Sequence, residues 1–451
     1  MTSVRARGAP RPSPGSRPTV RPSQIPGAER PLRVALLSYR SKPHCGGQGV
    51  YVRHLSRELT DLGHSVEVFS GQPYPELEPG PVLTELPSLD LYRDEDPFRT
   101  PGLAEYRDWV DVLEVAAMRT GAFPEPLTFS LRALRALRAR PGDFDVVHDN
   151  QVLGYGLLGL GRLGLPLVTS IHHPVSVDRR IELEAARGLS RLAKRRWYAF
   201  VRMQGRVAHR VSRSGPILTV SQSSRADIIK DFRAVPDSVK VIPLGVDTRL
   251  FHPRPGPRVP GRIVAVASAD SPMKGVTTLL RAFAVLAGRP GHGDTQLIVV
   301  SKPTPGGPTD RLLAELRLAD RVRFQHGMPH TELAELLASA QIAVVPSLYE
   351  GFSLPAVEHM ASGTPLVASR TGALPEVTGE AAVLVEPGEP GELAAALARL
   401  LDQPAERDRL SQAALARVAE RFAWPAVARA TVAQYRAVVA SVGLASGQGK
   451  H

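Results

Sequence analysis

The sequence predicts an α/β fold in which two doubly wound domains face each other across a deep cleft. Short apolar segments with the pattern of buried strands alternate along the chain with amphipathic segments of helical period. This alternation is typical of a parallel sheet with helices on both faces. The pattern starts near Pro31 and starts again at Gly261, so we expect two such sheets. Ligands of these sheets bind beyond the carboxyl ends of the strands.

The first domain opens with a strand, a glycine-rich loop and a helix. Residues 31–38 read PLRVALLS, the apolar run of a buried strand. In the loop that follows, Gly46 and Gly47 would let the backbone approach a phosphate or an acceptor. Residues 50–63 have apolar side chains at helical spacing. Further strands are predicted at residues 64–71, 144–151 and 165–173.

The second domain repeats the order of strand, loop and helix. Prolines and glycines cluster in residues 245–261 and indicate the join between the domains. We therefore expect an N-terminal domain over residues 31–235 and a C-terminal domain over residues 236–420. Residues 421–451 are expected to form a helix that packs back on the N-terminal domain, and then a short tail. The strands of the second domain are predicted at residues 261–268, 296–301, 321–327, 341–347, 364–369 and 381–387.

The net charge of +12 raises the question of nucleic-acid binding. The charge is concentrated, however, because residues 1–30 carry six arginines and one glutamate among many prolines and serines. Such a segment cannot bury a core, so we expect a disordered basic tail. No apolar segment follows its arginines, as one would in a secretory signal. We therefore expect no specific nucleic-acid partner.

Cysteine usage and hydropathy bear on the compartment. The single cysteine, Cys45, excludes an intrachain disulfide and points to a reducing compartment. The most apolar glycine-rich run, residues 152–161, is too short to span a bilayer. We expect a cytoplasmic protein, with the inner face of the membrane as an alternative location.

One segment makes the membrane alternative concrete. Residues 187–213 carry many arginines and lysines and no acidic residue. We predict one helix here, with its apolar stripe on the protein and its basic face toward an anionic membrane or an acceptor. A merely solvated surface is the alternative. The apolar stripe comprises Trp197, Phe200, Val201, Val207, Ala208 and Val211.

Residues 346–367 concentrate the chemistry of the second domain. A strand ends in the loop LYEGFSL, and Pro355 then suits the first turn of a helix. The free amides of Phe352, Ser353 and Leu354 would lie at this helix N-terminus, which is a ready anion site. Gly351 would let the loop turn.

Two glutamates flank this helix start, with seven residues between them. We expect Glu358 in the first turn, pointing toward the cleft mouth, where a carboxylate can accept hydrogen bonds from the two hydroxyls of a ribose. Glu350 would then face the sugar of a nucleotide sugar. The alternative is that Glu358 only caps its helix and Glu350 is a solvated loop residue.

The stretch resembles the E-x7-E signature of the family-four retaining glycosyltransferases, which have the two-domain GT-B fold. The resemblance covers nearly the whole chain from residue 31. Its strongest block is PSLYEGFSLPAVEHMASGTPLVASRTGALPEV at residues 346–377. Further blocks are GGQGVYVRHLSRELTDLGHSVEVFS, VTSIHHP, TVSQSSRADI, PLGVDTRLF and KGVTTLLRAF, in family order.

The resemblance implies a role for several residues. Lys274 matches the lysine that neutralises the donor diphosphate, and Glu350 and Glu358 match the glutamates near the donor sugar and on the ribose. His172 aligns with the histidine aimed at the reacting sugar, and its neighbour His173 competes for that role. The chain departs from the family pattern at Ser268-Ala269, where the family usually has Gly-Arg, so a second phosphate-binding cation is missing.

A metal is not expected at this site. Two neighbouring histidines could suggest one, but neighbours on a strand point to opposite faces, and no ligands follow at zinc-like spacing. On the first-domain side of the cleft, Asp149, Asn150 and Asp178 are candidates for acceptor binding, with loop hydrogen bonding as their alternative role.

The resemblance implies a metal-independent hexosyltransferase without a cofactor, which moves a sugar from a nucleoside-diphosphate sugar to an acceptor with retention. The acceptor is a sugar, lipid or small molecule that the sequence does not identify, and the donor base and sugar are equally open. Two alternatives are a nucleotide-sugar epimerase of the same fold and a basic membrane- or nucleic-acid-binding protein with a decayed transferase site.

Overall fold

The computed structural model describes residues 30–41, 47–93 and 95–448, and it confirms the α/β prediction. The described chain contains two parallel sheets, one of seven strands and one of six. In the first, the strand order is β3-β2-β1-β4-β5-β6-β7, and in the second it is β10-β9-β8-β11-β12-β13. Both orders reverse direction once, between β1 and β4 and between β8 and β11, which is the doubly wound arrangement.

The strands are short, and those in the middle of each sheet are mostly buried, as expected when helices cover both faces of a parallel sheet, whereas the edge strands are more exposed. The first sheet comprises β1 (Arg33–Ser38), β2 (Ser65–Ser70), β3 (Val82–Glu85), β4 (Val146–Asn150), β5 (Leu167–Ser170), β6 (Ile217–Thr219) and β7 (Val239–Val241). The second comprises β8 (Val259–Val266), β9 (Gln296–Val300), β10 (Val322–Gln325), β11 (Ala340–Val345), β12 (Leu366–Ser369) and β13 (Ala382–Val385).

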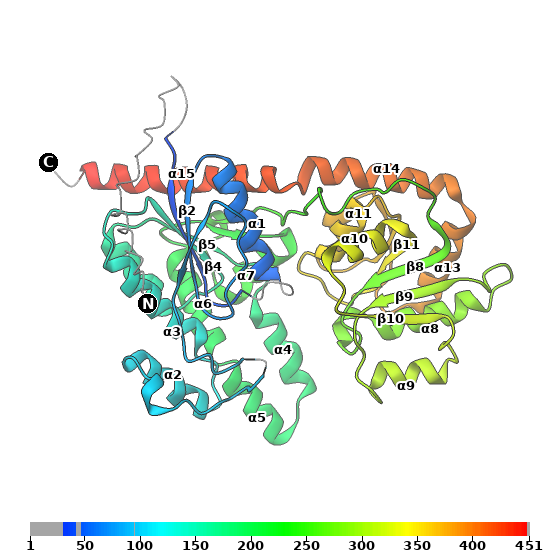
Figure 1. Cartoon of the computed structure of the whole chain (residues 1–451), viewed down its shortest axis with the longest axis horizontal. Helices are drawn as coiled ribbons and strands as arrows, with labels where there is room; N and C mark the ends of the chain where they lie inside the picture. Colours follow the sequence, from blue (N-terminus) through cyan, green and yellow to red (C-terminus); the bar gives the residue numbers. More distant parts are fainter. Residues whose placement is uncertain (1–29, 42–46, 94, 449–451) are drawn as a thin grey trace, which may run out of the picture. The chain divides into compact units, whose positions relative to one another are not determined.

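The helices alternate with these strands along the chain (Figure 1). Those of the first half are α1 (Gly47–Asp61), α2 (Trp109–Arg119), α3 (Glu125–Arg138), α4 (Val175–Ala185), α5 (Gly188–Trp197), α6 (Phe200–Val211) and α7 (Gln222–Phe232). Those of the second half are α8 (Val276–Ala287), α9 (Pro308–Glu315), α10 (His330–Ser339), α11 (Leu354–Ala361), α12 (Leu374–Thr378), α13 (Pro390–Asp402), α14 (Pro404–Arg421) and α15 (Trp424–Gln448). Among the described residues, no helix combines the length and hydropathy needed to cross a bilayer.

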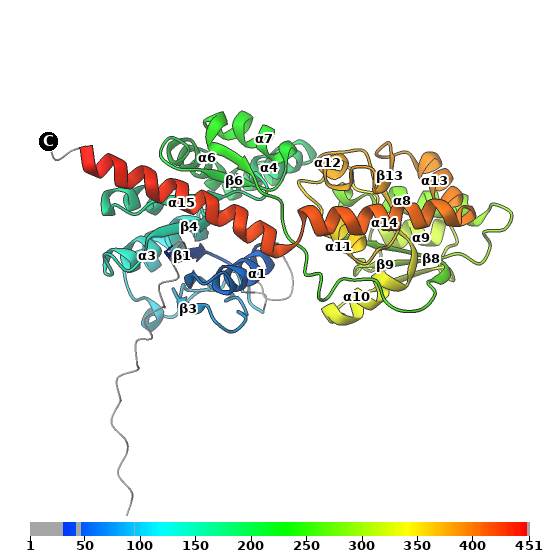
Figure 2. The ribbon, with the colours of Figure 1, turned by 90° about the horizontal axis from the view of Figure 1, so that it is seen from above.

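The last helix returns to the first sheet. In Figure 2, α14 runs beside α11 and α15 runs beside α1, and both pairs are in contact. The crossing point is tight, since a Cβ on Gly245 would lie 2.4 Å from the Trp424 ring. Further along α15, the Tyr435 hydroxyl lies 2.5 Å from Nδ1 of His148 on β4, and both side chains are fully buried.

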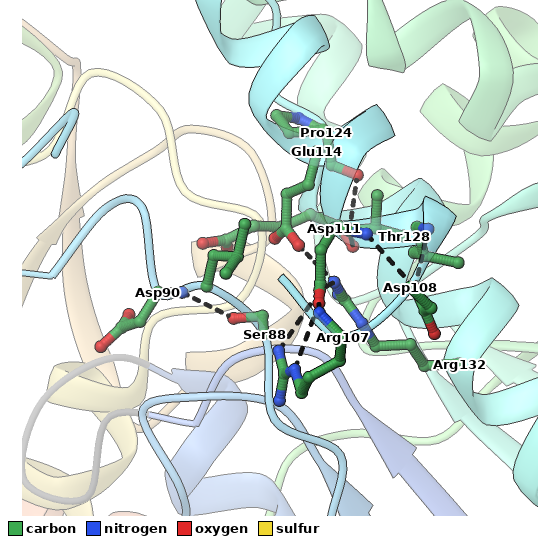
Figure 3. A network of polar contacts seen from close by, with 12 residues as sticks. Ser88, Asp90, Arg107, Asp108, Asp111, Glu114, Pro124, Thr128 and Arg132 are labelled. Atoms are coloured by element: carbon green, nitrogen blue, oxygen red, sulfur yellow. Dashed lines mark hydrogen bonds and ion pairs between the residues drawn. The ribbon is translucent and has the colours of Figure 1, made fainter. Parts of the chain in front are cut away.

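A buried ionic network holds α2 against α3 (Figure 3). Arg132 of α3 donates to Asp111 at 2.6 Å and also to Glu114, and both carboxylates on α2 are 1 % exposed. Burial raises the pKa of Glu114 even beside this guanidinium. Because removing one partner would leave buried charge uncompensated, the network fixes how the two helices pack.

The segment over residues 187–213 forms two helices, so the prediction of one helix was wrong. The helix is interrupted between Trp197, the last residue of α5, and Phe200, the first residue of α6. The break lets both aromatic rings reach Phe123, at centroid distances of 5.1 and 5.3 Å. The predicted apolar stripe does pack on the protein along α6, where Val201, Val207, Ala208 and Val211 are buried.

Candidate active site

A cavity of about 810 Å³ lies beyond the carboxyl ends of strands from both sheets. The loops that follow β5, β6, β8 and β11 line it, together with α4 and α5. Its lining residues include His172, His173, Asp178, Ile181, Glu182, Lys194, Tyr198, Ser271, Met273, Lys274, Tyr349, Glu350, Gly351, Phe352, Ser353 and Leu354. A larger cavity of about 990 Å³ lies elsewhere, along α6.

An ion pair joins the loops after β8 and β11. Nζ of Lys274 lies 2.7 Å from Oε1 of Glu350, and the Ser347 hydroxyl donates to the same oxygen at 2.7 Å. Glu350 is 8 % exposed, whereas Lys274 keeps 35 % of its side chain exposed. Glu350 is therefore a buried, paired group, and the alternative of a solvated loop residue was wrong.

Two glycines allow this close approach. Gly275 has φ +65°, and a Cβ there would lie 1.9 Å from the carbonyl oxygen of Pro346. Gly372 has φ +51°, and a Cβ there would lie 2.2 Å from the carbonyl oxygen of Glu350. Any other residue would push the loops apart, so these glycines place Lys274 within reach of Glu350.

The predicted helix start is present as α11. Ser353 is its N-cap, with φ +82°, and its hydroxyl accepts from the Ala356 amide at 3.4 Å. The preceding Gly351 carbonyl accepts from the hydroxyls of Ser221 and Ser224, at 2.7 and 3.2 Å. The loop is thus held from both sides, and Phe352, Ser353 and Leu354 all line the cavity.

Glu358 does not lie in the first helical turn, where it was predicted. It is the fifth residue of α11 and lies in the second turn, because the helix starts at Leu354 and has no acidic residue in its first turn. The cap is made by Ser353, so the cap alternative for Glu358 was wrong. Among the described residues, the Glu358 carboxylate has no hydrogen-bond partner. Burial raises its pKa to about 7. It does not line the 810 Å³ cavity itself.

His172 is held as a neutral imidazole. Its Nε2 lies 2.6 Å from Oδ1 of Asn150, and its ring packs edge-on to Tyr51 at 4.5 Å. Burial lowers the pKa of His172 to about 4. With the Asn150 amide as oriented here, Oδ1 can only accept, so Nε2 carries the proton and Nδ1 keeps its lone pair.

His173 lines the same cavity as His172, and the expectation that both histidines lie on a strand was wrong. The reason is that β5 ends at Ser170, and both histidines lie in the bend beyond it, where the alternation of a strand no longer applies. Nε2 of His173 lies 3.0 Å from Oδ1 of Asp178 on α4.

The other predicted residues of the first domain lie deeper. Asp149 is fully buried and accepts from the amides of Val152 and Leu153, so it takes the loop role. Burial raises the pKa of Asp149 to about 7. Asn150 is also fully buried and orients His172. Gly47 begins α1, whereas Gly46 lies outside the described residues.

The structure adds Ile181 and Glu182 to Asp178, which the sequence had already singled out, and the three form one wall of the cavity. Asp178, Ile181 and Glu182 lie at positions i, i+3 and i+4 of α4, on one helix face, and all three line the cavity. Lys194 of α5 pairs with Glu182 at 3.2 Å. The i, i+3, i+4 spacing directly after the histidine pair was the signal that could have revealed this wall.

Ala269, which stands where the family usually has an arginine, is buried and faces no open space. Ala269 is 4 % exposed, its amide donates to Ser301 and its carbonyl accepts from Thr309, both at 2.8 Å. Of the described residues that line the cavity, the lysines are Lys194 and Lys274. No group of three potential metal ligands occurs in the described part of the chain.

Comparison with known proteins identifies the family. The model of glycosyltransferase family 4 matches residues 45–250, and that of the glycosyl transferases group 1 matches residues 260–403. An MMP alpha-(1->4)-mannosyltransferase of Mycolicibacterium hassiacum is 56 % identical over 91 % of this chain and 99 % of its own. The chain belongs to glycosyltransferase family 4. A D-inositol 3-phosphate glycosyltransferase of Thermobispora bispora is 30 % identical to this glycosyltransferase, over 88 % of this chain and 92 % of its own.

Solved structures support the fold of the glycosyltransferase. Sucrose-phosphate synthase from Thermosynechococcus elongatus superimposes with a TM-score of 0.68 at 25 % identity, over 91 % of this chain and all of its own. WaaG, a glycosyltransferase involved in lipopolysaccharide biosynthesis, gives a TM-score of 0.60 at 18 % identity, over 87 % of this chain and 97 % of its own. The GT-B fold expected from the resemblance is therefore confirmed.

Proposed function

We propose that this glycosyltransferase moves a mannosyl group from a nucleoside-diphosphate mannose to the 4-hydroxyl of a saccharide acceptor, with retention of the α configuration. The observation that carries the donor site is Glu358, a desolvated carboxylate without a protein partner, on the helix whose N-terminus lines the cavity. The mannosyl group and the linkage follow the name of the relative that is 56 % identical.

The anionic and hydroxyl groups of the donor match different groups of the protein. The loop amides at the start of α11 and the Lys274 ammonium would hold the diphosphate, since a helix N-terminus and a cation both favour negative charge. Glu358 would accept hydrogen bonds from the ribose hydroxyls, which supply the partners that its carboxylate lacks. Glu350 would face the sugar and share Lys274 with the diphosphate.

The acceptor would bind against α4. Carboxylates of Asp178 and Glu182 and the ring of Tyr198 form a surface of hydrogen-bond acceptors and apolar area, which suits a sugar with many hydroxyls. His172 lines the same cavity and would lie near the reacting sugar. Because His172 is neutral, it would contribute a hydrogen bond and not a charge.

In the reaction, the bond from the anomeric carbon to the diphosphate oxygen breaks and a bond to the acceptor oxygen forms on the same face. The acceptor proton passes to the leaving diphosphate oxygen. An α-linked donor then gives an α-linked product. The protein's part is to position both substrates and to stabilise the leaving charge.

The charge would be balanced without a metal ion. Lys274 supplies one cation, and Lys194, which lines the same cavity, is the candidate for the place of the missing arginine. To reach the diphosphate, the Lys194 side chain would have to leave its ion pair with Glu182 and pair with a phosphate group.

The proposal is tested by incubation of the enzyme with UDP-, GDP- and ADP-mannose and the corresponding glucose nucleotides, each with an oligomannoside. Mass spectrometry should show acceptor plus one hexose with a mannose nucleotide, and NMR of the first product should show an α-(1→4) linkage. A glucose-only product would refute the donor, and release of free nucleotide without a glycoside would indicate the epimerase alternative.

Lys274→Ala should weaken nucleoside-diphosphate binding by about 1.5–3 kcal/mol, because it removes a charged hydrogen-bond partner of the diphosphate. Calorimetry measures the change, with Lys230→Ala, an exposed lysine of α7, as the matched control. A loss below three-fold would place the phosphates elsewhere. EDTA should leave turnover intact, and strict dependence on a divalent ion would overturn the metal-free proposal.

We also propose that α5 contacts an anionic membrane from the cytoplasmic side. No residue of α5 is buried, and Leu189 and Leu192 are 85 % and 51 % exposed beside Arg195 and Arg196. Exposed leucines among basic residues suit a lipid interface. Arg195→Ser with Arg196→Ser should reduce sedimentation with phosphatidylglycerol vesicles by several-fold and leave turnover on a free acceptor unchanged. Unchanged sedimentation would end this idea.

A further inference from the structure

The 990 Å³ cavity is lined by an unusual set of charges. Seven arginines and two carboxylates line it, together with His209. The arginines come from α4, α5, α6 and the residue after α7, so segments distant in the sequence meet there. They are Arg179, Arg180, Arg191, Arg202, Arg206, Arg210 and Arg233.

Most of these guanidinium groups have no acidic partner. Arg180 donates to Asp231 at 2.7 Å, and Ser176 holds the same carboxylate at 2.7 Å. Among the described residues, none of the other six arginines pairs with a carboxylate. Arginines elsewhere in the same half of the chain commonly do, as Arg33 does with Asp145 and Arg40 with Glu125.

The arginines of α6 repel one another when no anion is bound. Arg202, Arg206 and Arg210 are four residues apart, so they lie in one stripe along the helix. Like charges at this spacing destabilise a helix, and α6 has no acidic residue in its first turn to offset them. A bound anion would remove the repulsion, and guanidinium groups bind phosphate with two parallel hydrogen bonds.

The cavity has the size and the floor of a small-molecule site. Its volume lies within the range of ligand pockets, whereas a nucleic acid would need an extended basic surface. Val201 and Phe232 line it and are 6 % and 4 % exposed, so an apolar floor lies beneath the charged rim.

We propose that this cavity binds a soluble anion with two or more phosphate groups, at a site separate from the active site. Helix α4 separates the two sites: Asp178, Ile181 and Glu182 line the active-site cavity, whereas Arg179 and Leu183 line the anion cavity.

The test uses inorganic tripolyphosphate as the probe and the full chain. Replacement of Arg202, Arg206 and Arg210 by serine should weaken tripolyphosphate binding about 100-fold or more in calorimetry, and Arg206→Ser alone about ten-fold. The matched control replaces Arg138, Arg162 and Arg281 by serine, which changes the net charge equally at exposed sites without ion pairs. The control should bind within about three-fold of the wild type.

Two further arms give the opposing outcomes. Lys274→Ala should keep binding at the anion cavity, so loss of all tripolyphosphate binding in this variant would place the probe in the active site and overturn the proposal. Equal weakening in the triple-serine variant and its control would show general charge attraction and would also overturn it. If the protein does not bind tripolyphosphate but binds phosphatidylglycerol vesicles, and the triple-serine variant loses this vesicle binding, the cavity would be assigned to a membrane instead. The single variant keeps the test valid if the triple variant does not fold.

Discussion

Glu350→Gln should lower turnover by about 100-fold or more while nucleoside-diphosphate affinity stays within about three-fold of the wild type. Glu350 is proposed to face the reacting sugar, where contacts act mainly in the transition state. The diphosphate, by contrast, depends on Lys274, which keeps its charge when its carboxylate partner becomes an amide. Glutamine is the sharper replacement because Glu350 is buried, so alanine would add a cavity to the loss of charge.

Because Lys274 and Glu350 form an ion pair, their two variants should have different effects on binding and stability. Lys274→Ala leaves the buried Glu350 carboxylate with Ser347 as its side-chain partner, so it should harm both binding and stability. Glu350→Gln, in contrast, leaves a partly exposed lysine free to meet the diphosphate. Steady-state kinetics, calorimetry and melting curves of the two variants and the double variant measure the coupling. Equal loss of nucleotide affinity in both single variants would contradict the division of roles between the two residues.

Glu358→Gln should stabilise the empty enzyme at pH 8 and weaken nucleoside-diphosphate binding about ten-fold or more. Burial raises the pKa of Glu358 from 4.5 to about 7. Below pH 4.5 the carboxyl is protonated in both the folded and the unfolded chain, so it adds nothing. As the pH rises toward 7, the unfolded chain releases this proton first, so the free energy of unfolding falls, and the full penalty remains above pH 7.

The penalty amounts to about 1–3 kcal/mol after allowance for partial exposure, or a few degrees of melting temperature at pH 8. At pH 4 the difference between Glu358→Gln and the wild type should nearly vanish. Glu335→Gln, an exposed site on α10 without an ion pair, is the matched control. Nucleotide affinity of the wild type should also rise between pH 6 and 8, because the ribose hydroxyls need the ionised carboxylate. A variant that melts lower than the wild type at pH 8, or binds nucleotide equally well, would refute this role.

Several features of the site could not be predicted from the sequence. Lys274 and Glu350 are 76 residues apart, and they meet because β8 and β11 are neighbours in the sheet and two glycines let their loops touch. His172 meets Asn150 for the same reason, since β4 and β5 are neighbours. Glu358 lies in the second turn of α11 and not in the first, because Ser353 caps the helix and the helix starts at Leu354, one residue before Pro355.

The sequence by itself determined the two parallel sheets, the switch between strand, loop and helix, and the loop with Glu350 and Ser353 that leads into the helix of Glu358. These features depend on local periodicity and on turn residues, which act over a few positions. Only the tertiary structure decided which charged groups are paired, that the Glu358 carboxylate is desolvated without a partner, and that α4 lies between two cavities. The reason is physical: burial and ion pairing depend on neighbours supplied by strand order and loop packing, and residue type and spacing along the chain do not specify those neighbours.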